Sequence, residues 1–207
     1  MTSTSPTLII QARAGDTQAL DRLLREWYPP LMGFTRQYFQ GRFPAEVAEE
    51  LARDAVQAVC VSVHRSLDKL REPGAFKSWL YRIATYQCYE EERRWRKRSE
   101  KVVPFRQLRT EEDEEGNPQE LSFGSSASYA DQPLEHADLQ EQIQAALGRL
   151  SPEQRAVLIM KEYEGLKFRE IAEALNISEN TVKSRLYYAL QHLRKDLPTW
   201  QKIREQL

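Results

Sequence analysis

The chain has 207 residues, of which 41% are hydrophobic and 29% are charged, and its formal net charge at pH 7 is −1. This length suits two small helical domains, and the apolar content is enough for two small cores. No stretch approaches the roughly 20 apolar residues that a membrane-spanning helix requires, and the N-terminus does not resemble a secretory signal. We therefore expect a cytoplasmic protein without stable membrane insertion.

The sequence offers few residues for metal binding or catalysis. Cys60 and Cys88 lie far apart inside apolar helical segments, which favours reduced thiols in a core. The three histidines, His64, His136 and His192, have no Cys or carboxylate partners at ligand spacing. The sequence also contains no Gly-rich phosphate loop, G-x-S-x-G elbow or H-E-x-x-H pair. We expect no metal, no cofactor, no catalytic residues and no enzymatic activity.

The first hundred residues predict helices throughout, because apolar residues recur at three- and four-residue spacing. A short first helix precedes a second one that Asp16 or Thr17 can cap. Pro29 and Pro30 mark a bend or the first turn of a new helix. A long helix with an apolar stripe is expected over residues 47–70. These elements predict one all-helical domain.

The last helix of this domain is expected to start near Ala75 and to become steadily more polar. Its end carries a basic run around an indole ring, formed by Arg93, Arg94, Trp95, Arg96, Lys97 and Arg98. Such a run suits the phosphates of a duplex or a single strand. Trp95 has two readings, stacking on a base or packing against the protein.

Helical periodicity stops in the middle of the chain. Residues 102–133 are rich in Glu, Gly, Ser and Pro and have no repeating apolar face, which is typical of a linker. The charge divides in the same place, with +4 over residues 1–101, −8 over 102–141 and +3 over 142–207. We predict an all-α protein of two small domains, 1–101 and 134–207, joined by a flexible acidic linker, 102–133.

The second domain has explicit helix signals. A helix is expected over residues 134–150, and Ser151, Pro152 and Gln154 then form a capping box with proline in the first turn. That helix is expected to end near Glu164 and Gly165, and a short helix follows over residues 168–175. Asn176 breaks the short helix, and Ser178 caps the last long one.

The segment REIAEALNISENTVKSRL has the spacing of a helix-turn-helix. Ala172 permits a close helix approach, Asn176 tolerates the left-handed conformation of a tight turn, and Val182 lies in the shared core.

A projection of the last helix at about 100° per residue separates an apolar stripe from a polar outer face. The stripe contains Val182, Leu186, Ala189, Leu190 and Leu193, and the outer face and its flanks contain Asn180, Thr181, Lys183, Ser184, Arg185, Tyr187, Tyr188 and Gln191. In the DNA major groove, amides and hydroxyls suit base edges, cations suit phosphate or guanine, and aromatic rings suit thymine methyls. The alternative is a solvated face, but surface faces seldom carry two adjacent tyrosines without a contact.

The segment LSPEQRAVLIMKEYEGLKFREIAEALNISENTVKSRLYYALQHLRKDL resembles the C-terminal domain of sigma-70 family RNA polymerase sigma factors of the extracytoplasmic-function group. In the first domain, DAVQAVCVSVHRSL resembles the family segment that docks on the polymerase clamp helices. FKSWLYRIATYQCYEEERRWRKR resembles the segment that melts and reads the minus-ten promoter element. The resemblance covers roughly residues 7–101 and 134–197.

The resemblance implies roles for individual residues. It assigns the minus-thirty-five element to Asn180, Thr181, Lys183, Ser184, Arg185, Tyr187 and Tyr188, and the minus-ten element to Tyr86 and the basic run 93–98. It assigns contact with core polymerase to Asp54 and Gln57. Ala58, in the segment that docks on the polymerase, stands where the family often has Glu, a departure that concerns core binding. Tyr86 stands where Asn is usual and Glu90 where Asp is usual, so the promoter specificity is expected to be atypical.

The resemblance also implies the partners: bacterial core RNA polymerase, promoter DNA and an anti-sigma factor. The acidic linker is then either an RNA mimic inside the polymerase or a solvated tether. Two other functions stay open from the residues alone. One is an autonomous helix-turn-helix regulator that binds a palindromic site, and the other is an adaptor that has kept the fold without promoter activity. The sequence does not specify the promoter or the regulon.

Overall fold

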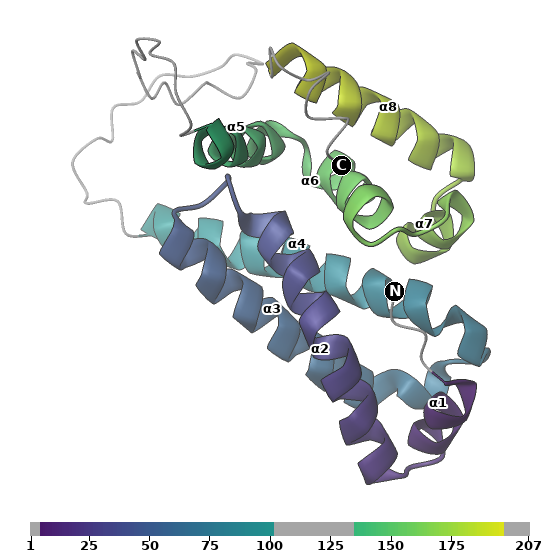
Figure 1. The fold of residues 1–207 in the computed structure, drawn as a ribbon. Coiled ribbons are helices and arrows are strands. Elements are labelled where there is room, and N and C mark those ends of the chain that lie inside the picture. Colours follow the sequence, from purple (N-terminus) through teal and green to yellow (C-terminus); the bar gives the residue numbers. More distant parts are fainter. Residues whose placement is uncertain (1–4, 102–134, 197–207) are drawn as a thin grey trace, which may run out of the picture.

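The structure is a computed structural model that describes the backbone of residues 5–101 and 135–196, and the side chains of residues 5–98 and 142–196. All regular elements in these ranges are helical (Figure 1). The predicted linker, 102–133, and the C-terminal segment 197–207 lie outside the described residues. The prediction of an all-α fold is confirmed.

The described part of the first domain, residues 5–101, contains four α-helices. They are α1 (Pro6–Arg13), α2 (Thr17–Phe39), α3 (Ala45–Ser66) and α4 (Phe76–Lys101), and two single 3-10 turns, Leu67–Lys69 and Pro73–Ala75, connect α3 to α4. Asp16 caps α2, because its carboxylate accepts hydrogen bonds from the backbone N–H groups of Gln18 and Ala19 at 2.9 and 3.1 Å. Of the two candidate caps, Asp16 or Thr17, the structure uses Asp16.

Helix α2 continues through Pro29 and Pro30. A new helix beginning at this pair, one of the two alternatives that the sequence suggested, is wrong. Each proline removes one backbone donor and normally disfavours the helix interior. Buried residues on both sides of the pair, Trp27 and Leu31 among them, anchor the helix to the core, and tertiary packing of this kind supplies most helical stability.

Aromatic rings fill much of the first core. Trp27 lies edge-on to Phe76 and Tyr81, with ring centroids 5.7 and 6.3 Å apart, and Phe34 lies edge-on to Tyr81 at 5.3 Å. Such pairs contribute roughly 0.5–1.5 kcal/mol each beyond the area they bury. They join α2 to the start of α4 and so fix the helix that carries the basic run.

The second domain contains α5 (Glu135–Arg149), α6 (Pro152–Leu158), α7 (Phe168–Leu175) and α8 (Glu179–Asp196). The capping box is present: Gln154 donates its backbone N–H to Ser151 Oγ at 3.2 Å, and Ser151 donates its own to Gln154 Oε1 at 3.3 Å. Helix α6 passes directly into a π-helical turn, Ile159–Tyr163. The helix end near Glu164 is confirmed, and the π turn was not expected.

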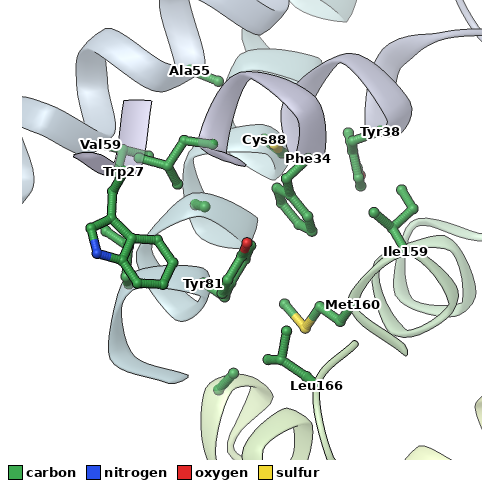
Figure 2. Packing of buried hydrophobic residues seen from close by; sticks show 14 of the residues in the cluster. Trp27, Phe34, Tyr38, Ala55, Val59, Tyr81, Cys88, Ile159, Met160 and Leu166 are labelled. Atoms are coloured by element: carbon green, nitrogen blue, oxygen red, sulfur yellow. The ribbon is translucent and has the colours of Figure 1, made fainter. Parts of the chain in front are cut away.

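The two domains pack against each other. Helix α7 lies between α8 and α4 (Figure 1). Helix α2 also contacts the π turn. Figure 2 shows Ile159, Met160 and Leu166 of the second domain pointing toward Phe34 and Tyr81 of the first. All five side chains are buried. A shared apolar interface therefore joins the two helical units.

Arg155 is the largest fully buried side chain in the described parts of the chain. Its Nε donates to Leu147 O at 2.9 Å, and its Nη2 donates to Gly148 O and Leu150 O at 2.8 and 2.9 Å. Its Nη1 crosses the interface to Tyr38 O at 3.0 Å. Burial lowers the pKa of Arg155 to about 10, and the nearby charge of Arg42 acts in the same direction. The guanidinium thus caps the C-terminus of α5 and links it to α2.

Candidate nucleic-acid interface

Helices α7 and α8 form the predicted helix-turn-helix. Asn176 adopts the left-handed conformation, with φ 53° and ψ 49°, and among the described non-glycine residues it alone has a positive φ. Ile177 then donates its backbone N–H to Ala172 O at 3.1 Å, which closes the end of α7. The turn that Asn176 permits sets the angle at which α8 leaves α7.

The start of α8 is fixed by local hydrogen bonds. Thr181 donates its backbone N–H to Ser178 Oγ at 3.0 Å, and the two hydroxyls lie 2.8 Å apart. Ser184 donates its hydroxyl to Thr181 O at 3.0 Å. The hydroxyls of Thr181 and Ser184 therefore already have partners, and Asn180 and Lys183 are exposed in this first stretch, as are Glu179 and Ser184.

The outer face of α8 has the predicted composition. Tyr187 and Tyr188 are 63% and 52% exposed, and their rings lie edge to face at 5.6 Å. Lys183 is exposed, with its Nζ 5.8 Å from the ring centroid of Phe168 on α7. The inner stripe is buried at Val182, Leu186, Ala189 and Leu193, while Leu190 is half-buried. The predicted division into two faces is confirmed.

Arg185 lies on the flank of α8 that faces the first domain. Its side chain is half-buried, and its positive charge acts on the hydroxyl of Tyr89 on α4. Burial raises the pKa of Tyr89, and Arg185 opposes that rise only in part. Of the side chains that the sequence grouped together on α8, Arg185 is thus the one directed toward the domain interface.

The basic run on α4 is tied to acidic residues of the same helix. Arg93, Arg94 and Arg96 pair with Glu90, Glu91 and Glu92 at 2.8, 2.6 and 2.8 Å, while more than half of each arginine side chain remains exposed. Residues 90–98 therefore carry a net charge of only +2. The ion pairs hold each guanidinium in place on the helix surface. Lys97 and Arg98 are also exposed and complete the basic end.

The two remaining minus-ten candidates differ in exposure. Tyr86 is 59% exposed on α4. Trp95 is half-buried, and its ring lies edge-on to Phe43 with the centroids 4.9 Å apart. This contact supports the packing alternative for Trp95. Tyr86 is therefore the aromatic residue on α4 that is open to a base.

Helix α3 packs against α2 and α4 and presents its outer face to solvent. Gln57 is exposed on that face, Asp54 is half-buried, and Val61 is a large apolar side chain that is 42% exposed. A mixed polar and apolar surface of this kind suits a protein partner. The candidate polymerase contacts therefore lie on a different helix from the candidate DNA contacts on α4 and α8.

The described part of the chain contains no group of three His, Cys, Asp or Glu residues that could hold a metal ion. In the same residues, no helix is both long enough and apolar enough to span a bilayer. Cys88 is buried and Cys60 half-buried, and both are free thiols. Burial raises the pKa of each thiol, which disfavours the reactive thiolate.

Comparison with known proteins gives a family match in each half of the chain. The family description "Sigma-70 region 2" matches residues 23–100, and "Sigma-70, region 4" matches residues 140–193. The ECF RNA polymerase sigma factor SigM of Mycobacterium tuberculosis is 30% identical over 182 residues, an alignment that covers 88% of this chain and 79% of SigM. The chain belongs to the extracytoplasmic-function (ECF) group of the sigma-70 family. It is a sigma factor, a protein of transcription initiation.

Other relatives and solved structures agree with this assignment. The ECF sigma factor SigE of Mycolicibacterium smegmatis is 34% identical over 143 residues, which span 69% of this sigma factor but only half of SigE. CnrH, solved with the cytosolic domain of CnrY, superposes with a TM-score of 0.61 at 22% identity over 92% of this chain and 94% of CnrH. RpoE of Bartonella quintana, solved with the anti-sigma factor NepR, gives 0.58 at 20% identity over 86% and 96%. These two likenesses show the fold.

Within this sigma factor, α2, α3 and α4 belong to region 2, and α7 and α8 to region 4. The sequence did not identify Arg155 as important. A signal was present, because one arginine follows the Ser151 capping box and directly precedes the apolar run Ala156–Met160. An arginine beside such a run either is buried, and then needs several hydrogen-bond acceptors, or lies exposed at the end of the helix.

Proposed function

We propose that this sigma factor binds core RNA polymerase through the outer face of α3 and recognises promoter DNA with α4 and α8. The observation that supports this most directly is the exposed face of α8, where Asn180, Lys183, Tyr187 and Tyr188 project away from a buried stripe. A rigid helix with amide, cation and aromatic groups on its outer side suits the major groove. In this proposal α8 binds the minus-thirty-five element.

The candidate DNA-binding side chains of α8 fall into groups according to the contacts that they make in the structure. Lys183 and Asn180 are suited to base edges and phosphate near the start of the helix, and the two tyrosine rings are suited to sugars and thymine methyls further along. Thr181 and Ser184 act mainly through the hydrogen bonds that fix the helix start. Arg185 contributes to DNA binding once the first domain no longer faces it.

Helix α4 is proposed to bind the minus-ten element. Tyr86 stacks on an unpaired base, and the run Arg93, Arg94, Arg96, Lys97 and Arg98 binds the phosphates around it. Trp95 supports this surface from beneath, through its packing on Phe43. Each phosphate contact steepens the salt dependence of binding, so this surface contributes affinity more than sequence specificity.

Asp54 and Gln57 are proposed to contact the polymerase, with Val61 as the apolar part of the same surface. The RpoE structure contains an anti-sigma factor, and we infer that this chain has one as well. In the proposed organisation, residues 1–101 bind polymerase and the minus-ten element, 102–133 link the domains, and 134–207 bind the minus-thirty-five element. The protein acts in the cytoplasm, by binding and without catalysis.

A binding experiment tests this proposal. Core polymerase with the protein retains genomic DNA fragments on a filter, and the retained fragments are sequenced and measured individually. Lys183→Ala should weaken retention of a selected fragment by roughly 5- to 150-fold, since a good base contact supplies about 1–3 kcal/mol. Arg25→Ala, which removes an exposed cation from α2, is the matched control and should change retention less than about twofold.

Two outcomes would contradict the proposal. Equal losses for Lys183→Ala and Arg25→Ala would show that α8 contributes only general charge. Equally tight binding by the isolated protein, without core polymerase, would instead identify an autonomous regulator.

A further inference from the structure

The domain interface contains an unusually close approach of two glycines, Gly41 after α2 and Gly148 in α5. A Cβ atom on Gly148 would overlap the carbonyl oxygen of Gly41 and would lie 3.2 Å from the backbone nitrogen of Arg42. A Cβ atom on Gly41 would overlap the carbonyl oxygen of Gln144 in the same way. The two backbones therefore touch directly, and neither position has room for a side chain.

This close approach lies beside the polar contacts that cross the interface. Gln144 Nε2 donates to Gln37 Oε1 at 3.1 Å, and Arg155 Nη1 donates to Tyr38 O at 3.0 Å. Gly148 itself supplies one of the carbonyl acceptors for Arg155. The glycine contact and the buried guanidinium thus form one continuous structure between the end of α2 and the end of α5.

The other end of the interface is held by different groups. Tyr81 on α4 donates its hydroxyl to the carboxylate of Glu164, and Lys77 Nζ donates to Glu164 O at 3.2 Å. A cavity of about 420 Å³, lined by these residues and by Trp27 and Tyr163, lies next to them. This end contains open space, whereas the glycine end is packed backbone to backbone. A small change at the glycine end therefore has the larger steric effect.

In the packed arrangement of the two domains, α4 and α8 lie too close together to bind both promoter elements at once. Helix α7 packs against both α4 and α8, and the axes of adjacent packed helices lie about 8–10 Å apart, so the axes of the two DNA-binding helices are at most roughly 20 Å apart. Elements centred at minus-ten and minus-thirty-five are about 25 base pairs apart, which is about 85 Å along B-DNA. The outer face of α3 remains open in the packed form.

We propose that Gly41 and Gly148 act as a clasp that closes this sigma factor into a resting form, which exposes the polymerase-binding face of α3 but cannot span a promoter. This proposal rests on the proposed function for its consequence at the promoter. The clasp itself is a property of the free protein. A single methyl group at Gly148 should open it, because all three nearest neighbours of that methyl group are backbone atoms of the first domain.

Gly148→Ala is the variant that disturbs the contact with Gly41 without weakening α5 itself. Gly148 lies inside α5, where alanine is a better helix former than glycine by roughly 0.5–1 kcal/mol, so the second domain is not weakened by propensity. Gly41 has φ +74°, and a side chain there would be strained even without the second domain. Gly33→Ala in α2 is the matched control, since its added Cβ meets no atom within 4 Å.

Small-angle X-ray scattering of the full chain measures the opening. Two domains with radii of gyration of about 13 Å each should give roughly 20 Å when packed and about 28 Å when their centres move to about 50 Å apart. We expect Gly148→Ala to show the larger value and Gly33→Ala to match the unsubstituted protein. Hydrogen exchange should show lost protection at residues 34–41 and 159–166 but not along α3 or α8.

Two results would overturn the clasp. An unchanged radius of gyration for Gly148→Ala would show that the interface tolerates the methyl group. Loss of protection throughout α5–α8 would show that Gly148 serves the fold of its own domain instead. Neither measurement contains DNA or polymerase, so a failed clasp and a failed promoter function are distinguished.

Discussion

Replacing Arg155 by methionine perturbs both the second domain and its contact with the first. Methionine retains an unbranched apolar stem but removes all the donors, so the carbonyls of Leu147, Gly148, Leu150 and Tyr38 lose their guanidinium partner. Three of these four acceptors belong to the second domain, and the fourth crosses the interface. Most of the loss should therefore appear as reduced stability of α5–α8.

The size of the stability loss follows from the burial of the Arg155 guanidinium and its hydrogen bonds. A hydrogen bond to a charged group contributes about 1.5–3 kcal/mol, but removing the guanidinium also relieves the cost of burying a charge. We therefore expect a net loss of roughly 3–5 kcal/mol in the free energy of unfolding, less than four such bonds added together.

Urea unfolding followed by circular dichroism at 222 nm measures this loss. Arg149→Met is the control, because Arg149 is the last residue of α5, the helix that Arg155 caps, 69% of its side chain is exposed, and its ion pair with Asp196 lies on the surface. The control should change stability by less than about 0.5 kcal/mol. A loss below about 1 kcal/mol for Arg155→Met would refute the assignment of Arg155 as the cap of α5.

Three further substitutions test other parts of the structure. Asn176→Gly should leave the thermal midpoint nearly unchanged while Asn176→Ala lowers stability by about 1 kcal/mol, because only the alanine resists the left-handed conformation; equal effects would contradict the turn. Ser151→Ala should cost about 1 kcal/mol in urea unfolding through loss of the capping box with Gln154, and no measurable cost would count against that cap. Burial raises the pKa of Glu164 above its ordinary 4.5, against the opposing effects of Tyr81 and Lys77, so the packed form favours the protonated carboxyl. Glu164 therefore stabilises the domain packing fully below about pH 4.5, and this stabilisation is lost as the pH rises through the raised pKa. Glu164→Gln should therefore flatten the pH dependence of the radius of gyration between pH 4 and 7, and an unchanged profile would show that ionisation of Glu164 does not control the domain packing.

The helix-turn-helix could be predicted from sequence because its signals are local. Ser151, Asn176 and Ser178 each act on residues within four positions, and the apolar stripe of α8 follows from helical periodicity alone. The direction of Tyr187 and Tyr188 followed from the same periodicity. These predictions required no knowledge of the rest of the chain.

The packing of the two domains could not be predicted in this way. Arg155 meets Tyr38 across 117 sequence positions, and Gln144 meets Gln37 across 107, so neither contact leaves a local pattern. Gly148 reads as a weak point in a helix until its neighbour Gly41 is known. Continuity of α2 through Pro29 and Pro30 likewise depends on burial of the surrounding side chains.

Transcription with purified components tests whether α8 directs this sigma factor to its promoters. Core polymerase, the protein and sheared genomic DNA are incubated with nucleotides, and the 5′ ends of the transcripts are mapped. We predict transcripts from a small set of start sites that share an upstream element, together with a marked loss of those transcripts for Lys183→Ala but not for Arg25→Ala. An absence of protein-dependent start sites, or start sites equally used by the Lys183→Ala variant, would contradict the proposal that α8 directs this sigma factor to its promoters.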